Sequence, residues 1–455
     1  MSIDGVLFIS CFLPLLLAIH WLIPGEKARN YILLAAGLIF CAFGSLSGLV
    51  LLMAMTGLNY LLGRAVMADR KPKLCCALAV VADLGILIFF KYLDFLLSQV
   101  LGLPQMQLGL AAPLGISFYT FKCIAYIVDT YRNREQGTKS FSWLLLYTSF
   151  FPQLTAGPIS RFGQFRGCLT GRQWVPEKVA CGLRRFVLGL GKKLLLAGTL
   201  AKITDGVFGL MPEQLNWLSA WLGAVSYMLQ LYFDFSGYSD MAIGLGAAFG
   251  FETPENFRYP YSAWSVGDFW RRWHISLSSW FKDYLYIPLG GNRHGKARAA
   301  LNKALVFLFC GIWHGADWTF LVWGLWHGLF SALESAGTIR PKKGLLSRIY
   351  TLLVVCLGFV IFRAASLSEG FFLIRAMFTG FGGSGLPEGL LTGESILAFA
   401  VAGIFAQPVT EQLKNTAFGR RVLEPASWGL VLILFVLCLS KLASGGFVPF
   451  IYAQF

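Results

Sequence analysis

The chain has 455 residues, of which 56% are hydrophobic and only 13% are charged, and its mean hydropathy is +0.63. Soluble globular domains carry about 25% charged residues, so this composition excludes an ordinary soluble domain and predicts an all-α, polytopic membrane protein. The net charge of +15 comes from basic residues in short loops between apolar runs, which is the positive-inside pattern; we therefore expect the lipid bilayer and an anionic cosubstrate as partners, and no nucleic acid.

The first 140 residues predict five membrane spans. Apolar runs of the length that crosses a bilayer recur through this part of the chain. Lys27 lies in the loop after the first run and Arg70 in the loop after the third, so the positive-inside rule places both loops in the cytoplasm and the N-terminus outside. The five spans are expected near residues 5–23, 31–44, 46–63, 75–97 and 112–130.

The middle of the chain predicts irregular membrane segments. The apolar run that starts at Phe150 is broken by Pro152, Gly157 and Pro158, which is typical of a re-entrant segment packed within protein. Two spans are expected near 194–208 and 216–235. Residues 257–303 are too polar for lipid and too aromatic for a plain loop, so they predict amphipathic helices on the inner face.

The last part of the chain predicts further spans that lead to an outer C-terminus. These spans are expected near residues 300–313, 316–337, 346–366, 393–409 and 428–446. Basic loops around Arg340 and Arg420 mark the cytoplasmic side, so a single span carries the chain outward to Tyr452. We predict 11 to 13 crossing or re-entrant helices in one domain of residues 1–455, made of N-terminal spans (1–140), a catalytic core (141–340) and C-terminal spans (341–455).

Histidines are the first candidates for chemistry. His314 lies in C-G-I-W-H-G-A-D-W beside Trp313 and Asp317, and His274 lies in D-F-W-R-R-W-H-I-S. An ionisable group at membrane depth is a functional candidate, and imidazole is the side chain best suited to proton transfer near neutral pH. Taken alone, either histidine, like His327 in W-G-L-W-H-G, fits a buried structural role better than a catalytic one.

Other kinds of site are less well supported. The histidine spacings match no short metal-ligand motif, so no metal is expected, and no G-x-S-x-G or P-loop motif occurs in the chain. Asp234 and Asp240, in Y-F-D-F-S-G-Y-S-D, would suit a proton pathway or structural pairing with the arginines of the amphipathic stretch, and pairing is the favoured interpretation.

Several ordered motifs together resemble the membrane-bound O-acyltransferase (MBOAT) family. The chain is most similar to the branch of the alginate O-acetyltransferase membrane subunit, which is related to the teichoic-acid D-alanyl transfer protein. The resemblance covers nearly the whole chain. The motifs are P-L-G-I-S-F-Y-T-F, S-F-F-P-Q-L-T-A-G-P-I-S-R, Y-F-D-F-S-G-Y-S-D-M-A-I-G-L-G, P-E-N-F-R-Y-P-Y, D-F-W-R-R-W-H-I-S-L-S-S-W-F-K-D-Y-L-Y-I-P-L-G-G-N-R and G-I-W-H-G-A-D-W-T-F-L-V-W-G-L-W-H-G.

The resemblance implies a ring of helices around a thinned centre, with a cytoplasmic donor tunnel and an outer funnel for the acceptor. It makes His314 the catalytic base and places His274 in the same tunnel. Either a backbone N–H or a protonated His274 would stabilise the oxyanion.

The expected donor is acyl-CoA, most simply acetyl-CoA, or an acyl phosphopantetheine, with no permanently bound cofactor. The residues expected along the substrate path are Trp313, Asp317, Trp273, Asp234, Arg161, Arg271 and Arg272; the three arginines would contact donor phosphates or serve only as positive-inside residues.

The chain ends on F-I-Y-A-Q-F, and within this hexapeptide only Tyr452 carries a side-chain hydroxyl group. In similar envelope-polymer acylation systems this hexapeptide carries a tyrosine that accepts the acyl group, so the resemblance implies an acyl relay. An interfacial aromatic anchor is the alternative for Tyr452. The expected partners are an extracytoplasmic SGNH/GDSL-like transferase and a cell-surface polysaccharide, at a bacterial cytoplasmic membrane. A transporter or a scaffold for polysaccharide modification, without chemistry of its own, is the alternative function.

Overall fold

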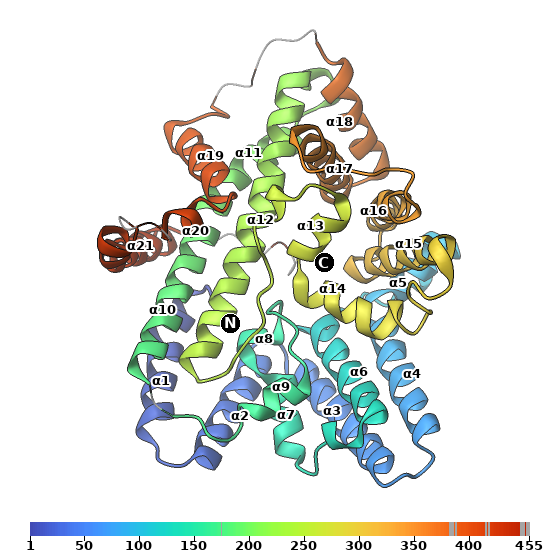
Figure 1. Ribbon diagram of the computed structural model, residues 1–455, viewed down its shortest axis with the longest axis vertical. Helices are drawn as coiled ribbons and strands as arrows, with labels where there is room; N and C mark the ends of the chain where they lie inside the picture. Colours follow the sequence, from blue (N-terminus) through green and yellow to red (C-terminus); the bar gives the residue numbers. More distant parts are fainter. Residues whose placement is uncertain are drawn as a thin grey trace. The chain divides into compact units, whose positions relative to one another are not determined.

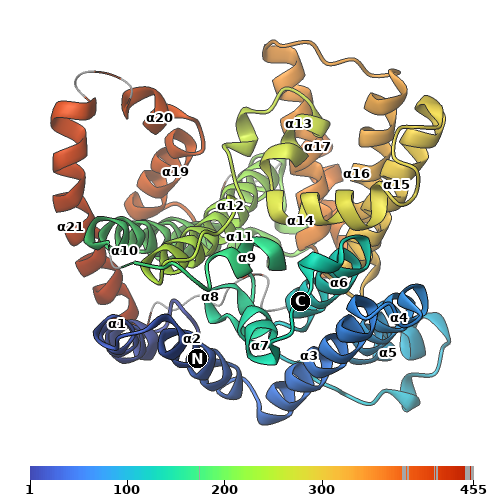
Figure 2. The same cartoon turned by 60° about the horizontal axis from the view of Figure 1, so that its bottom comes forward.

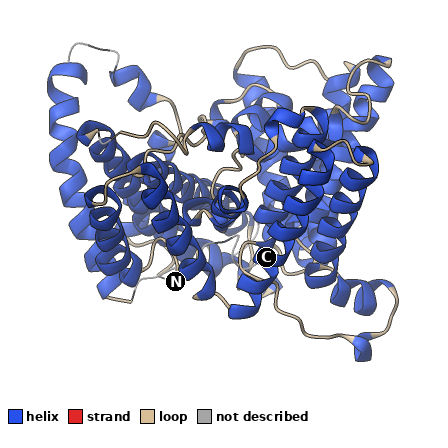
Figure 3. Ribbon diagram, turned by 90° about the horizontal axis from the view of Figure 1, so that it is seen from below, coloured by secondary structure: helices blue, strands red, loops and turns tan. Residues whose placement is uncertain are grey.

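The computed structural model describes residues 1–173, 175–381, 386, 389–414, 416, 419–445 and 451. Every regular element in these residues is a helix, as Figure 3 shows by its colouring, which confirms the predicted fold class. The chain forms two compact units: unit 1 comprises Met1–Phe186 and Ser239–Glu255, and unit 2 comprises Val187–Tyr238 and Asn256–Phe455, so far as it is described. The ring, the tunnel, the funnel and the subdivision at residues 140 and 340 stay predictions.

Unit 1 contains the N-terminal helices. They are α1 (Leu13–Leu22), α2 (Glu26–Ala42), α3 (Leu46–Met67), α4 (Pro72–Lys91), α5 (Leu93–Phe95), α6 (Ile116–Arg132), α7 (Phe141–Ser149), α8 (Phe151–Leu154) and α9 (Phe162–Gly167). All five predicted N-terminal spans correspond to helices, with ends that differ by a few residues. Helix starts follow local chemistry: the Ser45 hydroxyl accepts a hydrogen bond from the Gly48 amide at the start of α3, as an N-cap serine does.

Helices α3, α4 and α6 pack together as a group within unit 1 (Figure 2). Their shared core contains Val66, Ala79 and Ile127, all fully buried. Between α3 and α4, the Asn59 side chain donates to the Asp83 carboxylate at 2.9 Å. Helices α3 and α6 approach closely at Gly63, where an added Cβ would lie 2.8 Å from the Tyr126 hydroxyl oxygen.

The predicted interruption near Phe150 is present. Helix α7 ends at Ser149, and the short α8 starts at Phe151 with Pro152 in its first turn. Proline cannot continue α7 because it lacks an amide hydrogen and its ring clashes with the preceding turn. Phe151, Pro152, Gln153 and Leu154 are all buried, so this irregular piece lies within protein, as predicted for backbone that could not face lipid.

Helices α10 (Pro176–Gly191) and α12 (Trp217–Ala248) contribute residues to both units. The sequence predicted that the span in α12 ends at residue 235, but the helix continues to Ala248. The reason is that the polar residues after Phe235 have partners inside the protein: Asp240 accepts from Arg185 at 2.9 Å. A prediction from hydropathy ends the span where the chain becomes polar, whereas the actual helix continues because its polar side chains are paired.

Unit 2 contains the C-terminal helices. They are α11 (Gly198–Phe208), α13 (Val266–Arg272), α14 (Ile275–Phe281), α15 (Gly295–His314), α16 (Trp318–Ala336), α17 (Leu345–Arg363), α18 (Leu367–Thr379), α19 (Gly393–Phe405), α20 (Val409–Lys414) and α21 (Glu424–Ala443). The short α13 and α14 occupy the stretch that was predicted to form amphipathic helices. Helix α18 was not predicted from the sequence.

Helices α15, α16 and α17 lie side by side in unit 2 (Figure 1). The α15–α16 crossing has no room for side chains: a Cβ on Gly311 would lie 2.4 Å from the Phe320 carbonyl oxygen, and one on Gly324 would lie 2.5 Å from that of Phe307. Backbone atoms therefore meet directly, as small residues allow at helix contacts in membranes. This crossing places the end of α15 against α16.

Four of the described helices, α3, α4, α17 and α21, are long and apolar enough to cross a membrane. Two shorter apolar helices cover Phe8–Leu22 and Gly393–Phe405. On α21, Leu432, Ile433 and Val436 are exposed large apolar side chains, a surface suited to lipid. These features support membrane embedding, while the number of 11 to 13 crossings stays a prediction.

Candidate active site

His314 is the last residue of α15, and its side chain is surrounded by aromatic rings of unit 2. Its ring lies edge-to-face with Trp323 at 4.9 Å and with Phe362 at 5.3 Å between centroids. Trp323 belongs to α16 and Phe362 to α17. Only 4% of His314 is exposed, so the imidazole lies in an apolar and largely water-free environment.

Trp313 connects the two candidate histidines. Its ring lies 4.9 Å from that of His314 and 6.4 Å from that of His274. Trp313 is buried, and His274 is only 1% exposed. The structure thus brings the R-R-W-H and W-H-G motifs, whose histidines are 40 residues apart in the chain, to the same indole ring, as expected for residues that share a site.

Asn256 holds His274 in place, and the sequence reasoning missed this residue. The Asn256 side-chain oxygen accepts from the Ser276 amide at 3.2 Å and from the Ser276 hydroxyl at 2.9 Å, and it lies 3.2 Å from His274 Nδ1. Because this oxygen is already an acceptor, His274 Nδ1 is the donor and Nε2 carries the lone pair. The polar residue within the P-E-N-F-R-Y-P-Y motif was the signal that could have identified it.

The protonation of His274 differs from one option raised by the sequence. Burial lowers the pKa of His274 to about 3, because the charged imidazolium loses its hydration. The residue is therefore neutral near pH 7, and its Nε2 can accept but not donate a hydrogen bond. This low pKa disfavours a protonated His274 as the group that stabilises the oxyanion and favours the other option, a backbone N–H.

Asp234 lies in α12 beside Phe235, whose ring packs edge-on against His274 at 4.6 Å. The Asp234 carboxylate accepts from Lys193 Nζ at 2.6 Å and from the backbone amide of Ile451 at 2.9 Å. Both charged side chains are almost completely buried. The expected structural pairing of Asp234 is present, but the prediction that its partner is an arginine of the amphipathic stretch is wrong.

The remaining predicted residues of the R-R-W-H and W-H-G motifs have structural contacts. Trp273 is buried and packs against Phe269 and Phe359. Asp317 is exposed, and its side chain accepts from the Thr319 amide at 2.9 Å, which caps the start of α16. A role for either in substrate binding stays a prediction.

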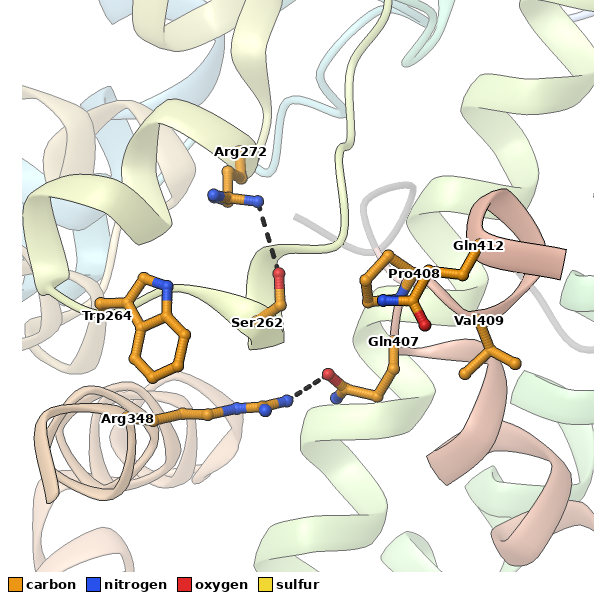
Figure 4. Close-up of a pocket in the computed structure, with 8 residues that line it drawn as sticks. All are labelled: Ser262, Trp264, Arg272, Arg348, Gln407, Pro408, Val409 and Gln412. Carbon is orange, nitrogen blue, oxygen red and sulfur yellow. Dashed lines mark hydrogen bonds between the residues drawn. The ribbon is translucent and has the colours of Figure 1, made fainter. Parts of the chain in front are cut away.

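A cavity of about 450 Å³ opens beside the end of α13 in unit 2 (Figure 4). Two arginines face it. Arg272 donates to the Ser262 hydroxyl at 3.3 Å and is paired with Asp268 at 3.0 Å. Arg348 donates to the Gln407 side-chain oxygen and to the Tyr261 carbonyl. The other lining residues are Trp264, Pro408, Val409 and Gln412.

The Arg348 side chain keeps its charge available for an anion. Both of its hydrogen-bond acceptors among the described residues are neutral oxygens. Arg271, by contrast, is mostly exposed and paired with Asp268. Arg348 therefore joins Arg272 as a candidate phosphate contact, and it was not identified from the sequence.

Three predictions are not tested by these contacts. Arg161 lies at the start of α9 in unit 1, and its contact with the donor stays a prediction. Tyr452 lies outside the described residues, although its neighbour Ile451 is among them. Within the described part of the chain, no group of three or more His, Cys, Asp or Glu side chains could hold a metal ion.

Comparisons with known proteins give the same picture as the motifs. The family model described as MBOAT, membrane-bound O-acyltransferase family, matches residues 128–338. The chain is 38% identical to the probable alginate O-acetylase of Azotobacter vinelandii, with all of both chains covered. It is 36% identical to the peptidoglycan O-acetyltransferase of Helicobacter pylori, over 82% of this chain and 78% of that one. It is 28% identical to the teichoic acid D-alanyltransferase of Bacillus subtilis, over 55% of this chain and 68% of that one.

Proposed function

This chain belongs to the membrane-bound O-acyltransferase family, and we propose that it moves an acetyl group from a cytoplasmic thioester, through Tyr452, toward hydroxyl groups of a cell-surface polysaccharide. The chain is a membrane O-acetyltransferase that acts in polysaccharide modification. The donor, the route and the tyrosine relay are the proposed parts. His314, buried among aromatic rings of three helices, is the observation that carries them.

The surroundings of His314 favour acyl transfer over hydrolysis. Trp313, Trp323 and Phe362 leave little room for water at the imidazole. A thioester that reaches this ring meets the intended acceptor hydroxyl in preference to water. Holding donor and acceptor on one imidazole also removes much of the entropic cost of a two-molecule reaction.

The proposed step is a general-base acyl transfer at His314. His314 accepts the phenolic proton of Tyr452 while the phenol oxygen attacks the thioester carbonyl carbon. The carbon–sulfur bond then breaks, and the departing sulfur takes the proton from His314 and leaves as a thiol. The acetyl group remains on Tyr452 as a phenyl ester. His274, neutral and fixed by Asn256, accepts a hydrogen bond from a substrate N–H or O–H through Nε2.

The cavity beside Arg272 and Arg348 is the proposed binding site of the donor's phosphate groups (Figure 4). Acyl-CoA and acyl phosphopantetheine both carry phosphate, which guanidinium groups bind well. Arg272 precedes His274 by two residues, so an anion held at this cavity lies close along the chain to the candidate site. Arg348 lies near the start of α17, directly after the basic loop around Arg340. The charge rule assigns that loop to the cytoplasm, which is where a thioester donor is found.

The second half of the route lies outside the membrane. A phenyl ester is more activated than an alkyl ester, so passing the acetyl group from Tyr452 to a sugar hydroxyl is downhill. An extracytoplasmic SGNH/GDSL-like transferase is the proposed partner for that transfer. The proposed location is the bacterial cytoplasmic membrane, with both termini outside.

The test uses the purified full-length chain and acetyl-CoA or an acetylated carrier protein. Intact mass analysis of the C-terminal peptide is expected to show one added acetyl group on Tyr452 in the wild type. His314→Ala is expected to lower this acylation by about a hundredfold or more, because general-base catalysis contributes 10²–10⁴-fold. Tyr452→Phe is expected to show no added mass and no polymer acetylation in cells.

Two results would contradict the proposal. Unchanged acylation in a folded His314→Ala variant would remove the general-base mechanism. Normal polymer acetylation with Tyr452→Phe would remove the relay and favour direct transfer to the polymer or a scaffold role. Tyr131→Phe, at an exposed tyrosine of α6, is the matched control and is expected to behave as the wild type.

A further inference from the structure

We propose that the buried Lys193–Asp234 ion pair is an anchor that holds the main chain at Ile451 and thereby positions the adjacent Tyr452 for acyl transfer. This inference rests on the proposed function, because it assigns a purpose to two residues through the relay role of Tyr452. It makes Lys193 and Asp234 positioning residues, which act on the reaction only through the placement of the acceptor.

The carboxylate of Asp234 binds two separate parts of the chain. Its Oδ1 accepts from Lys193 Nζ at 2.6 Å, and its Oδ2 accepts from the Ile451 amide at 2.9 Å. Ile451 is 217 residues away from Asp234 in sequence and is buried. The chain near its end is therefore held inside unit 2 by a charge-assisted hydrogen bond, which is stronger than a neutral one.

The local backbone is shaped to bring Lys193 to Asp234. Lys193 lies in a π-helical segment, Lys192–Ala197, that follows α10, and such segments are frequently found at functional sites. Gly237, three residues after Asp234, lies against this segment. A Cβ on Gly237 would be 2.6 Å from the Gly189 carbonyl oxygen and 3.1 Å from the Lys193 amide nitrogen, so only glycine permits this approach.

The anchor is also directly connected to the candidate site. Asp234 is followed in α12 by Phe235, whose ring contacts that of His274 at 4.6 Å. On the other side, Ile451 is followed by Tyr452, and consecutive Cα atoms are about 3.8 Å apart. One turn of α12 thus contacts both a candidate catalytic histidine and the residue that precedes the proposed acceptor.

A purely structural ion pair does not account for the bond to Ile451. Burying two charges costs solvation energy that their attraction does not fully return, so an apolar pair would stabilise the helix contact at least as well. An apolar residue at position 234 would, however, offer no acceptor to the Ile451 amide. Binding of the Ile451 amide explains why position 234 carries a carboxylate, and Lys193 neutralises the charge of that carboxylate.

The test compares two double variants that leave no unpaired buried charge. Lys193→Met/Asp234→Leu removes the acceptor, while Lys193→Met/Asp234→Asn keeps an amide oxygen that can bind the Ile451 amide. Hydrogen exchange of the C-terminal peptide, measured on the full-length protein in detergent, is expected to be roughly tenfold to a hundredfold faster in the Leu variant than in the wild type. The Asn variant is expected to stay near the wild type.

Acyl transfer provides a second readout. A merely structural role would affect transfer to Tyr452 and transfer to a free phenol equally, whereas loss of the anchor affects only the first. The Leu variant is expected to acetylate Tyr452 roughly tenfold to a hundredfold more slowly. It is expected to retain wild-type turnover of the thioester with added N-acetyltyrosinamide, a free phenol that needs no anchor. Asp240→Asn, in the same helix but paired with Arg185, is the control and is expected to change neither readout.

The possible failures are distinguishable. Equal exchange of the C-terminal peptide in the Leu variant and the wild type would overturn the anchor, whatever the activity. Equal loss of transfer to Tyr452 and to the free phenol would assign the pair a structural role and would also overturn it. Hydrogen exchange that depends on Asp234, in a protein that never acetylates Tyr452, would overturn both the relay and this use of the anchor. General-base transfer at His314 would then be tested separately, by transfer to the free phenol.

Discussion

At the scale of single residues, the site combines two buried histidines, of which His274 is neutral, with charged side chains that are paired or that line a separate cavity. His274 is fixed by Asn256 and is neutral near pH 7 because burial lowers its pKa to about 3. The cations lie elsewhere: Lys193 is neutralised by Asp234, and Arg348 lines the cavity. This separation suits a reaction in which the anionic part of the donor is bound away from the carbon that reacts.

The role of Arg348 gives a prediction about the donor. Arg348→Gln is expected to raise the KM for the thioester about tenfold or more, since a hydrogen bond to a charged group contributes about 1.5–3 kcal/mol. The kcat is expected to change little, because a phosphate contact binds ground state and transition state alike. Steady-state kinetics over a range of thioester concentrations measures both constants.

Arg340→Gln is the matched control for this prediction. Arg340 is exposed in the basic loop that precedes α17, and its side chain donates to the Gly337 carbonyl at 2.8 Å. An increase in KM of the same size in both variants would show that the effect comes from the overall positive charge of the cytoplasmic face and not from the cavity. An unchanged KM in Arg348→Gln would remove the cavity as the donor site.

At the scale of helices, the position of His314 is set by the crossing of α15 with α16. Gly311 and Gly324 bring the two backbones into contact, and His314 follows Gly311 by three residues. A shift of α15 would therefore move the imidazole directly. Placement of reactive groups within a fraction of an ångström decides rate, so the glycines of this crossing bear on catalysis without touching substrate.

Gly311→Ala is expected to destabilise the protein by about 1–3 kcal/mol, the usual cost of overpacking, and to lower acyl transfer. Its Cβ would lie 2.4 Å from the Phe320 carbonyl oxygen, so one of the two helices must move. Thermal unfolding in detergent and the rate of Tyr452 acylation measure the two effects. In α19, Gly403 has no atom within 4 Å of an added Cβ, so Gly403→Ala is expected to be neutral or slightly stabilising. Wild-type stability and activity in Gly311→Ala would contradict the prediction.

The sequence predicted most helices but not their contacts. Apolar runs of span length identified the long helices because lipid imposes length and hydropathy. Helix α18 was missed because it has only 13 residues and contains the charged Glu369 and Arg375, so no apolar run of span length marks it. The extension of α12 beyond residue 235 was missed because it depends on partners that are distant in sequence.

The same limit applies to the candidate site. His314, His274 and Trp313 were identified from motifs, and the structure places them together. Asn256 and Lys193 were missed, since each acts through a contact with a residue 18 or 41 positions away. Residue type and spacing predict a reactive side chain, but they do not predict which residue holds it in position.

At the scale of the whole molecule, the proposed function requires opposite sides of the membrane for donor and acceptor. The basic loops predict which side is cytoplasmic, because positive charges near span ends are retained inside the cell. The charge rule places the loop with Arg70, directly before Lys73, inside and the chain end outside. This topology is a prediction, and it determines whether Tyr452 can meet an extracytoplasmic partner.

Cysteine labelling in cells tests this topology. In a background with the exposed Cys11 and Cys181 replaced by serine, Ala453→Cys is expected to react with a membrane-impermeant maleimide in intact spheroplasts. Lys73→Cys is expected to react only after lysis. Mass spectrometry of the labelled peptides identifies the site in each case. Labelling of Ala453→Cys only after lysis would place the chain end in the cytoplasm and exclude an outward relay through Tyr452.

The bond from Ile451 to Asp234 runs through the main chain, and this has a consequence for how the protein can vary. Any amino acid with an amide hydrogen can make the same bond, so docking of the chain end places no demand on the side chain at position 451 beyond its fit to a buried surface. Proline, which has no such hydrogen, is the one replacement that is ruled out by chemistry rather than by size. The attachment therefore tolerates most substitutions at position 451, and in the proposed relay only the next residue has to be a tyrosine.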